Sequence, residues 1–201
     1  MTDLAVPNHH AHYPGFAGVT GLVAALSFLK GRDNTASLAC DLVNLGHGDH
    51  LVDIGSGPGT GAAVACHRGA RVTAVDPANV MLRVGRIAHR NRLITWRIGS
   101  AEHLPVGDGE ADVVWSLAAV HHWTSIEQGL AEAQRVLTPN GRFLAIERRI
   151  EPDATGHASH GWTDTQADMF ATMCTNAGLH DAKVSRHDTD RGFTLAVLAH
   201  M

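Results

Sequence analysis

Three glycines at alternate positions directly follow an apolar run, and this pairing points to a binding loop. The stretch reads L-V-D-I-G-S-G-P-G-T-G-A from Leu51 to Ala62. A buried strand that ends in such a turn needs glycine, because the chain must adopt unusual backbone angles and leave no Cβ between itself and a ligand. The free N–H groups of the helix that follows then face that ligand. The pattern predicts a strand, a tight turn and a helix start that hold a small molecule.

A second carboxylate, Asp76, follows Asp53 by twenty-three residues and ends another apolar run. Carboxyl ends of neighbouring parallel strands meet at one edge of a sheet, so we expect both carboxylates at that edge. A carboxylate there can accept hydrogen bonds from both hydroxyls of a ribose, and it repels a 2′-phosphate. The alternative is that Asp76 and Pro77 only cap a helix.

The elements that position these residues alternate between strand and helix. The patterns predict strands at 51–54, 71–76, 93–98, 112–117, 142–147, 179–186 and 192–199. Helices are predicted at 16–29, from Asp33 or Asn34 to 45, at 60–67 and 80–88, from a Thr124–Glu127 capping box to 138, and from 163 to 178. This order predicts an α/β fold with a doubly wound, mostly parallel sheet that closes with an antiparallel strand pair.

Composition bounds the class of protein. The chain has 201 residues, 44% of them hydrophobic, and a formal net charge of -4, which fits one domain over 1–201 and disfavours a nucleic-acid surface. Three widely spaced cysteines without a CxxC pair favour free thiols in the cytoplasm. The apolar run 16–29 is too short for a membrane span, and no basic region precedes it. We therefore expect a small-molecule partner; the oligomeric state stays open.

The glycine loop alone is ambiguous. Residues 57–62 also fit the G-x-G-x-x-A fingerprint, so an NAD-dependent oxidoreductase is one alternative. The fuller pattern D-x-G-x-G-x-G from Asp53, the later G-S-A-E-H-L-P at 99–105, the strand 112–117 and L-x-P-x-G at 137–141 occur in the order of another family. The chain resembles the class I S-adenosylmethionine-dependent methyltransferases. Within that class it is similar to the small-molecule branch that includes ubiquinone and menaquinone biosynthetic C-methyltransferases.

The resemblance implies a three-layer, Rossmann-like sandwich with a seven-stranded sheet whose last strand is antiparallel, and a set of residues that bind S-adenosylmethionine. The glycine loop would lie under the methionine part, Asp53 would help hold its ammonium, and Asp76 would bind the ribose. The adenine would meet Met81 and the segment around Ser100, where the family's usual Asp is replaced. Residues implied at the cofactor are Asp53, Gly55, Ser56, Gly57, Asp76, Pro77, Met81, Ser100, Ala101, Glu102, Ser116 and Leu117. The chain divides into 1–46 (lid and helices), 47–148 (cofactor core) and 149–201 (loop, helix and strand pair).

Methyl transfer from a sulfonium is an in-line displacement that needs alignment, and a base only where the acceptor must lose a proton. His121 and His122 follow strand 112–117 at the edge where an acceptor would approach, so either is a candidate base or orienting group, or else a packing residue. Trp162, Glu147, His157 and His160 lie on the same side and are candidates for the acceptor mouth.

The N-terminal segment holds His9, His10, His12 and Tyr13. We expect a lid that brings Tyr13 over the cofactor, and we expect no metal site, because no cysteine or carboxylate stands beside these histidines. The apolar run 16–29 favours a hydrophobic acceptor, although the same residues fit a core. Besides the methyltransferase and the oxidoreductase, a non-catalytic S-adenosylmethionine-binding protein remains an alternative, because Ser100 departs from the family pattern and no base is certain.

Overall fold

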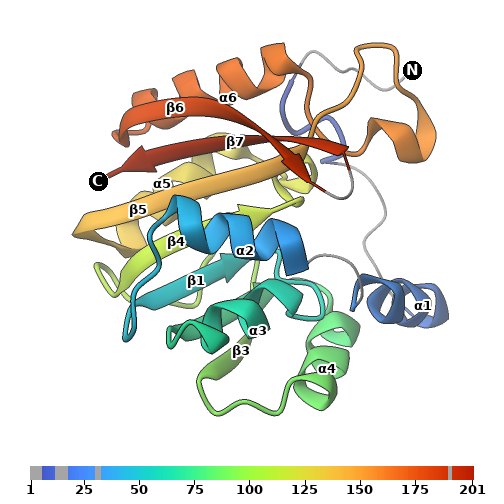
Figure 1. The fold of residues 1–201 in the computed structure, drawn as a ribbon, viewed down its shortest axis with the longest axis vertical. Coiled ribbons are helices and arrows are strands. Elements are labelled where there is room, and N and C mark those ends of the chain that lie inside the picture. Colours follow the sequence, from blue (N-terminus) through green and yellow to red (C-terminus); the bar gives the residue numbers. More distant parts are fainter. Residues whose placement is uncertain (1–5, 12–17, 30–32, 190–191) are drawn as a thin grey trace.

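A seven-stranded sheet with helices on both faces makes up the protein (Figure 1). This computed structural model describes residues 6–11, 18–29, 33–189 and 192–201. The strands are β1 (His50–Ile54), β2 (Arg71–Asp76), β3 (Ile94–Ile98), β4 (Ala111–Leu117), β5 (Leu137–Arg148), β6 (His180–Thr189) and β7 (Gly192–His200). Their order across the sheet is β3-β2-β1-β4-β5-β7-β6.

The pairing has the direction that the sequence predicts. Strands β3, β2, β1, β4 and β5 are joined by parallel ladders, whereas β7 runs antiparallel between β5 and β6. From β1 the chain first adds β2 and β3 on one side of that strand. It then crosses over, so that β4 lies on the other side of β1. Open α/β sheets bind ligands in the crevice outside the carboxyl ends of the strands at such a point.

Most of the helices form two outer layers. The helices are α1 (Gly18–Phe28), α2 (Asp33–Leu42), α3 (Thr60–His67), α4 (Asn79–Ala88), α5 (Ile126–Val136) and α6 (Asp164–Asn176), with short 3₁₀ turns η1 (Val120–His122) and η2 (Gly156–Ser159). One apolar core joins the sheet to α5 and α6, and a second joins its other face to α2 and α3. Residues of one strand alternate between the two cores, as the period of a strand requires. The doubly wound three-layer sandwich is confirmed.

Helix α1 lies outside these layers and packs on α4, at the lower right of Figure 1. Ala25 of α1 is buried against Met81 and Val84 of α4. The outer surface of α1 exposes Leu22, Val23 and Leu26. The predicted start of this helix at 16 falls outside the described residues. Among the residues described, no helix is long and apolar enough to cross a membrane.

The predicted start of helix α5 is wrong by one residue. Ser125, not Thr124, is the N-cap, and its hydroxyl accepts a hydrogen bond from the Gln128 N–H. The Thr124 N–H instead donates to the Glu102 carboxylate at 2.7 Å, which holds this residue outside the helix. The predicted end at 138 is also wrong, because Leu137 already pairs with Ala111 as the first residue of β5. The predicted start of α6 at 163 is confirmed, because Thr163 is its N-cap and forms a capping box with Gln166.

Candidate functional site

The carboxyl ends of four parallel strands bring the predicted site residues to one edge. Ile54 at the end of β1 pairs with Val75 of β2 on one side and with Ser116 of β4 on the other. Leu117 of β4 pairs with Ile146 of β5. The glycine loop, Asp76, the end of β4 and Glu147 therefore follow one another along this edge.

The glycine loop has the backbone that only glycine adopts readily. Gly55, Gly57 and Gly59 have φ angles of 70°, 54° and 81°. A Cβ at Gly55 would come within 2.5 Å of the Ala119 Cβ, so glycine is also needed for the close approach of the segment after β4. A Cβ at Gly57 would meet no heavy atom within 4 Å. Open space thus lies beside Gly57, on the side from which a ligand would contact the loop.

Asp76 lies beneath this loop and is bound to it. Its Oδ2 accepts a hydrogen bond from the Gly57 N–H at 2.8 Å, and its Oδ1 accepts one from the Ala78 N–H at 2.8 Å. The residue is 7% exposed, and burial raises the pKa of its carboxyl group against the opposing effect of these two bonds. Each carboxylate oxygen can accept a further hydrogen bond, so ribose binding requires only that the carboxylate become more accessible.

Asp53 is more deeply buried than its predicted role suggests. It is 2% exposed, and its Oδ2 lies 3.4 Å from the position that a Cβ would take at Gly61 in α3. Burial raises the pKa of Asp53 to about 7, and the nearby Asp76 carboxylate adds to this shift. The side chain therefore lies under the start of α3 rather than at the surface of the loop. A cationic ligand above it would favour its ionised form.

Two buried hydroxyl groups provide a test of whether a polar cofactor fits this edge. The Oγ atoms of Ser56, in the loop, and Ser116, at the end of β4, are buried and have no hydrogen-bond partner among the described residues. Buried polar groups in native proteins are nearly always bonded, so both hydroxyls are explained by a ligand or water that they bind. With the open space at Gly57, these two atoms make the edge suitable for a ligand that has several polar groups. The residues present fit S-adenosylmethionine.

The remaining predicted cofactor residues have diverse positions. Pro77 is exposed, and Ser100 is half-buried in the loop after β3. Met81 is 1% exposed beneath α1, so contact with an adenine would require α1 to shift. Ala101 packs toward α5, and Leu117 lies against the start of α3.

Glu102 has a structural contact that accounts for its presence. Its Oε1 accepts hydrogen bonds from the backbone N–H groups of Thr124 at 2.7 Å and Ser125 at 3.1 Å. The carboxylate thereby ties the loop after β3 to the start of α5, where negative charge is favourable. Its predicted role at the cofactor stays a prediction.

A cluster of histidines adjoins this edge beyond β4 and β5. His121 of η1 is 3% exposed, and its Nδ1 lies 2.8 Å from Oε2 of Glu147, whose side chain is fully buried at the end of β5. The His121 N–H also donates to the Glu147 Oε1, at 3.3 Å. On the far side of the ring, the His121 Nε2 lies 3.3 Å from the His160 Nδ1. The rings of His122 and His10 pack around this pair.

The charges in this cluster follow from its burial. Burial and the neighbouring His121 lower the pKa of His122 to about 3 and that of His160 to about 4. Both rings are therefore neutral near pH 7. Burial alone would raise the pKa of Glu147, but His121 and its hydrogen bonds hold that pKa below the usual value. The site consequently contains a buried carboxylate surrounded by imidazoles.

The described part of the N-terminal segment, residues 6–11, covers this cluster. The His10 N–H donates to the His121 carbonyl at 2.9 Å, and the Trp162 Nε1 donates to the Pro7 carbonyl at 2.9 Å. The His9 Nε2 lies 2.8 Å from the Ser159 carbonyl. In Figure 1 this dark blue segment runs beside the orange loop that follows β5. His12 and Tyr13, which the lid prediction also includes, fall outside the described residues.

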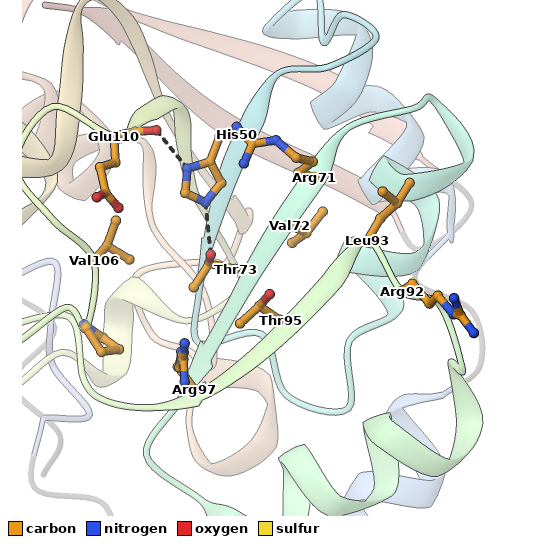
Figure 2. A pocket seen from close by; sticks show the side chains of 11 residues that line it. His50, Arg71, Val72, Thr73, Arg92, Leu93, Thr95, Arg97, Val106 and Glu110 are labelled. Carbon is orange, nitrogen blue, oxygen red and sulfur yellow. Dashed lines mark hydrogen bonds between the residues drawn. The ribbon is translucent and has the colours of Figure 1, made fainter.

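A cavity elsewhere in the described structure differs from this edge. It measures about 300 Å³ and is lined by Arg71, Arg92 and Arg97 among others (Figure 2). His50 crosses one side of it, with its Nε2 2.9 Å from the Thr73 hydroxyl. His50 and Arg71 are the first residues of their strands, so the cavity begins near the amino ends. It is therefore separate from the glycine loop and the histidines.

The sequence predicted that His121 and the glycine loop lie at this site, but it did not predict the partners of His121. Glu147 ends a parallel strand next to β4, so its place at this edge follows from topology. His10 and His160 reach the cluster from two irregular segments, and no periodic pattern in the sequence fixes the path of either one. The only available signal was their residue type.

The fold is that of a Rossmann-like α/β protein, with the predicted cofactor residues along the carboxyl edge of its sheet. Residues 52–145 match the family described as "Methyltransferase domain". Over 100 residues the chain is 40% identical to the ubiquinone/menaquinone biosynthesis C-methyltransferase UbiE of Rubrivivax gelatinosus, an alignment that covers 50% of this chain and 39% of that protein. The chain spans about half or less of the length of the curated relatives it matches.

Solved structures share the fold. An S-adenosylmethionine-dependent methyltransferase from Aquifex aeolicus aligns with a TM-score of 0.73 at 14% identity, over 89% of this chain and 97% of that one. The [4+2]-cyclase SpnF aligns with a TM-score of 0.75 at 13% identity, over 97% and 96%. The family match and the relatives show that the chain resembles class I S-adenosylmethionine-dependent methyltransferases of the UbiE type, and the solved structures show that it shares their fold. The resemblance stated from the motifs is confirmed.

Proposed function

We propose that this protein transfers a methyl group from S-adenosylmethionine to a small hydrophobic acceptor, with a hydroquinone as the acceptor class. The observation that carries the proposal is the carboxyl edge of the sheet. There the open side of Gly57 and the unpartnered hydroxyls of Ser56 and Ser116 adjoin the His121–Glu147 pair. A binding edge for the cofactor thus lies beside a group that can accept a proton.

The cofactor supplies an electrophilic methyl group that is already activated by the sulfonium charge. The residues of this chain bind and align it: Asp76 takes the ribose hydroxyls, the N–H groups and hydroxyls of the loop take the polar groups, and Asp53 contributes negative charge beneath. Alignment of this kind lowers the activation free energy of a two-substrate displacement by an amount on the order of several kcal/mol.

We assign the acid–base role to His121. Glu147 accepts a hydrogen bond from the His121 Nδ1, and this leaves Nε2 as the nitrogen that can accept a proton. A hydroquinone becomes a stronger carbon nucleophile when its hydroxyl proton moves to that nitrogen. S-adenosylmethionine, when bound, would supply the methyl group to a ring carbon. The proton that this carbon loses would pass to water, and His121 would return the hydroxyl proton to the ring oxygen, so that the aromatic hydroquinone is restored. His122 adjoins His121 and is proposed to orient the acceptor.

Two features support a hydrophobic acceptor. The relatives include a C-methyltransferase whose name places it in ubiquinone and menaquinone biosynthesis. Helix α1 presents Leu22, Val23 and Leu26 to the outside, an apolar surface next to α4. We further propose that residues 1–201 act as one unit, with Tyr13 in a lid, and that the protein works in the cytoplasm, where its buried thiols stay reduced.

Calorimetric titration with S-adenosylhomocysteine, with NAD as the control ligand, tests the cofactor. We expect micromolar binding of the first and none of the second. Asp76→Ala removes the proposed ribose contacts and should weaken binding by about 2–3 kcal/mol, or about 30- to 150-fold. Asp188→Ala, a change in the distant strand β6, is the control. Unchanged affinity in the Asp76 variant would remove Asp76 from the proposed site.

Methyl transfer from labelled S-adenosylmethionine to a set of hydroquinones, measured at saturating cofactor, tests the acid–base role. His121→Gln should lower kcat by about 100-fold or more while S-adenosylhomocysteine affinity stays close to wild type. His180→Gln changes an exposed histidine of strand β6 and should leave kcat unaltered. Equal kcat values for the two variants would contradict the role of His121.

A further inference from the structure

The histidine cluster has the geometry of a metal site, although the sequence led us to expect none. That expectation concerned the N-terminal histidines, beside which the sequence shows no cysteine or carboxylate. The structure brings Glu147 from β5 and His160 from the loop after it to His121 instead. One potential ligand nitrogen from each of His121, His122 and His160 lies within 4.8 Å of the other two.

We propose that His121, His122 and His160 bind a divalent first-row metal ion, Zn²⁺ in the cell, with at least one coordination position left open. Imidazole nitrogens are good ligands for zinc, and a three-histidine set with an open position is one of the arrangements seen at catalytic zinc. The site shares His121 and His122 with the proposed methyl-transfer site, but metal binding needs none of the cofactor residues.

The distance between two of the ligands supports this directly. Two nitrogens that each lie 2.0–2.1 Å from a tetrahedral zinc ion are about 3.3–3.4 Å apart. The His121 Nε2 and the His160 Nδ1 are 3.3 Å apart. In the present structure a single proton can lie between them, and an ion would take the place of that proton. The ligand nitrogens of all three histidines lie within 4.8 Å of one another, so His122 is close enough to complete the set.

The surroundings of His121 are those of a metal ligand. Its Nδ1 is 2.8 Å from the buried Oε2 of Glu147, so Nε2 is directed toward the cluster. Histidines that ligate metals regularly donate their other N–H to a carboxylate, which fixes the ring and makes the ligand more basic. Among the ion pairs of the described residues, His121 is the only partner of Glu147. A cation bound on the other side of the ring would compensate this buried negative charge.

The His10 ring closes the site from the N-terminal side. It stacks on the His160 ring with a centroid distance of 4.3 Å, and its Nε2 lies 3.1 Å from the Ser159 hydroxyl. The backbone bond from His10 to the His121 carbonyl fixes this arrangement. Residues 6–11 thus cover the proposed ion from one side and hold His160 in place.

The full chain without a polyhistidine tag is freed of metal with a chelator and titrated with Zn²⁺ and, separately, Co²⁺. We expect one tight equivalent per chain and the intense visible absorption that cobalt shows in tetrahedral sites. His160→Ala should weaken Zn²⁺ binding by about 100-fold or more, and Glu147→Gln by about 10- to 100-fold. His157→Ala is the matched control, because His157 is an exposed histidine of the same loop and should leave binding unchanged.

Two results would overturn the proposal. One is a wild-type protein that binds Zn²⁺ no more tightly than His160→Ala; the other is an equal loss in the His157 and His160 variants, which would indicate diffuse binding by surface histidines. Circular dichroism confirms that each variant is folded. S-adenosylhomocysteine titration of the same samples separates this result from the proposed function, since cofactor binding without metal binding would contradict only the metal site.

Discussion

Asp53→Asn should change how the stability of the protein depends on pH. The pKa of Asp53 in the folded chain is about 7 against an ordinary value of 3.8, chiefly because the group is buried. A carboxyl group whose pKa is raised by folding stabilises the folded state while it is protonated. That stability is lost as pH rises from the unfolded pKa to the folded one, and it does not change further above about 7.

The size of the effect follows from these two values. The difference between the two pKa values lowers the free energy of unfolding by about 1.7 kcal/mol at pH 5 and by about 4 kcal/mol at pH 8. The free energy of unfolding of wild type should therefore fall by about 2.5 kcal/mol between the two pH values. The amide that Asp53→Asn introduces does not titrate, and the variant should lack this loss. The assay is urea denaturation of both proteins at pH 5 and pH 8 without cofactor, with the exposed Asp153→Asn as control. A wild-type-minus-variant difference that is the same at both pH values would refute the reasoning.

Three further changes probe the glycine loop and the covering segment. Gly57→Ala places a methyl group in open space at φ 54°, so it should cost about 1–2 kcal/mol of stability but abolish S-adenosylhomocysteine binding in calorimetry. Gly55→Ala adds a contact of 2.5 Å with Ala119 and should lower the melting temperature further than Gly57→Ala does. Trp162→Phe removes the bond to the Pro7 carbonyl and should speed hydrogen exchange in residues 6–11, while α5 stays protected. Equal melting temperatures for the two glycine variants, or unchanged exchange, would contradict these accounts.

The part of the site at the ends of the parallel strands could be predicted, because the alternation of strands and helices determines where those strands end. Once apolar runs and helices alternate, each strand ends at the same edge, and Asp53, Asp76, Ser116 and Glu147 must gather there. Side-chain depth could not be predicted in the same way. Asp53 lies under α3 because its position on β1 faces the helix layer, whereas the family resemblance suggests only that it lies near the cofactor.

The irregular segments set the limit of the sequence reasoning. Thr124 and Ser125 both offer a hydroxyl at capping distance from an acidic or amide residue, and only the bond from the Thr124 N–H to Glu102 decides between them. His10 and His160 meet across 150 residues of sequence through loops that carry no periodic pattern. Such contacts depend on the packing of residues 6–11 against the loop after β5, which no local propensity encodes.

The proposed base and the proposed metal site use one atom, and this makes their consequences distinguishable. The His121 Nε2 cannot accept a proton from an acceptor while it ligates an ion. If His121 acts as the base, Zn²⁺ should inhibit methyl transfer, and a chelator should restore it without changing cofactor affinity. If the ion itself lowers the pKa of an acceptor hydroxyl, activity should instead require the ion and be lost in His160→Ala, a residue that the base mechanism does not need. Methyl-transfer rates of wild type and His160→Ala, each with chelator and with Zn²⁺, therefore decide which of the two the cluster performs.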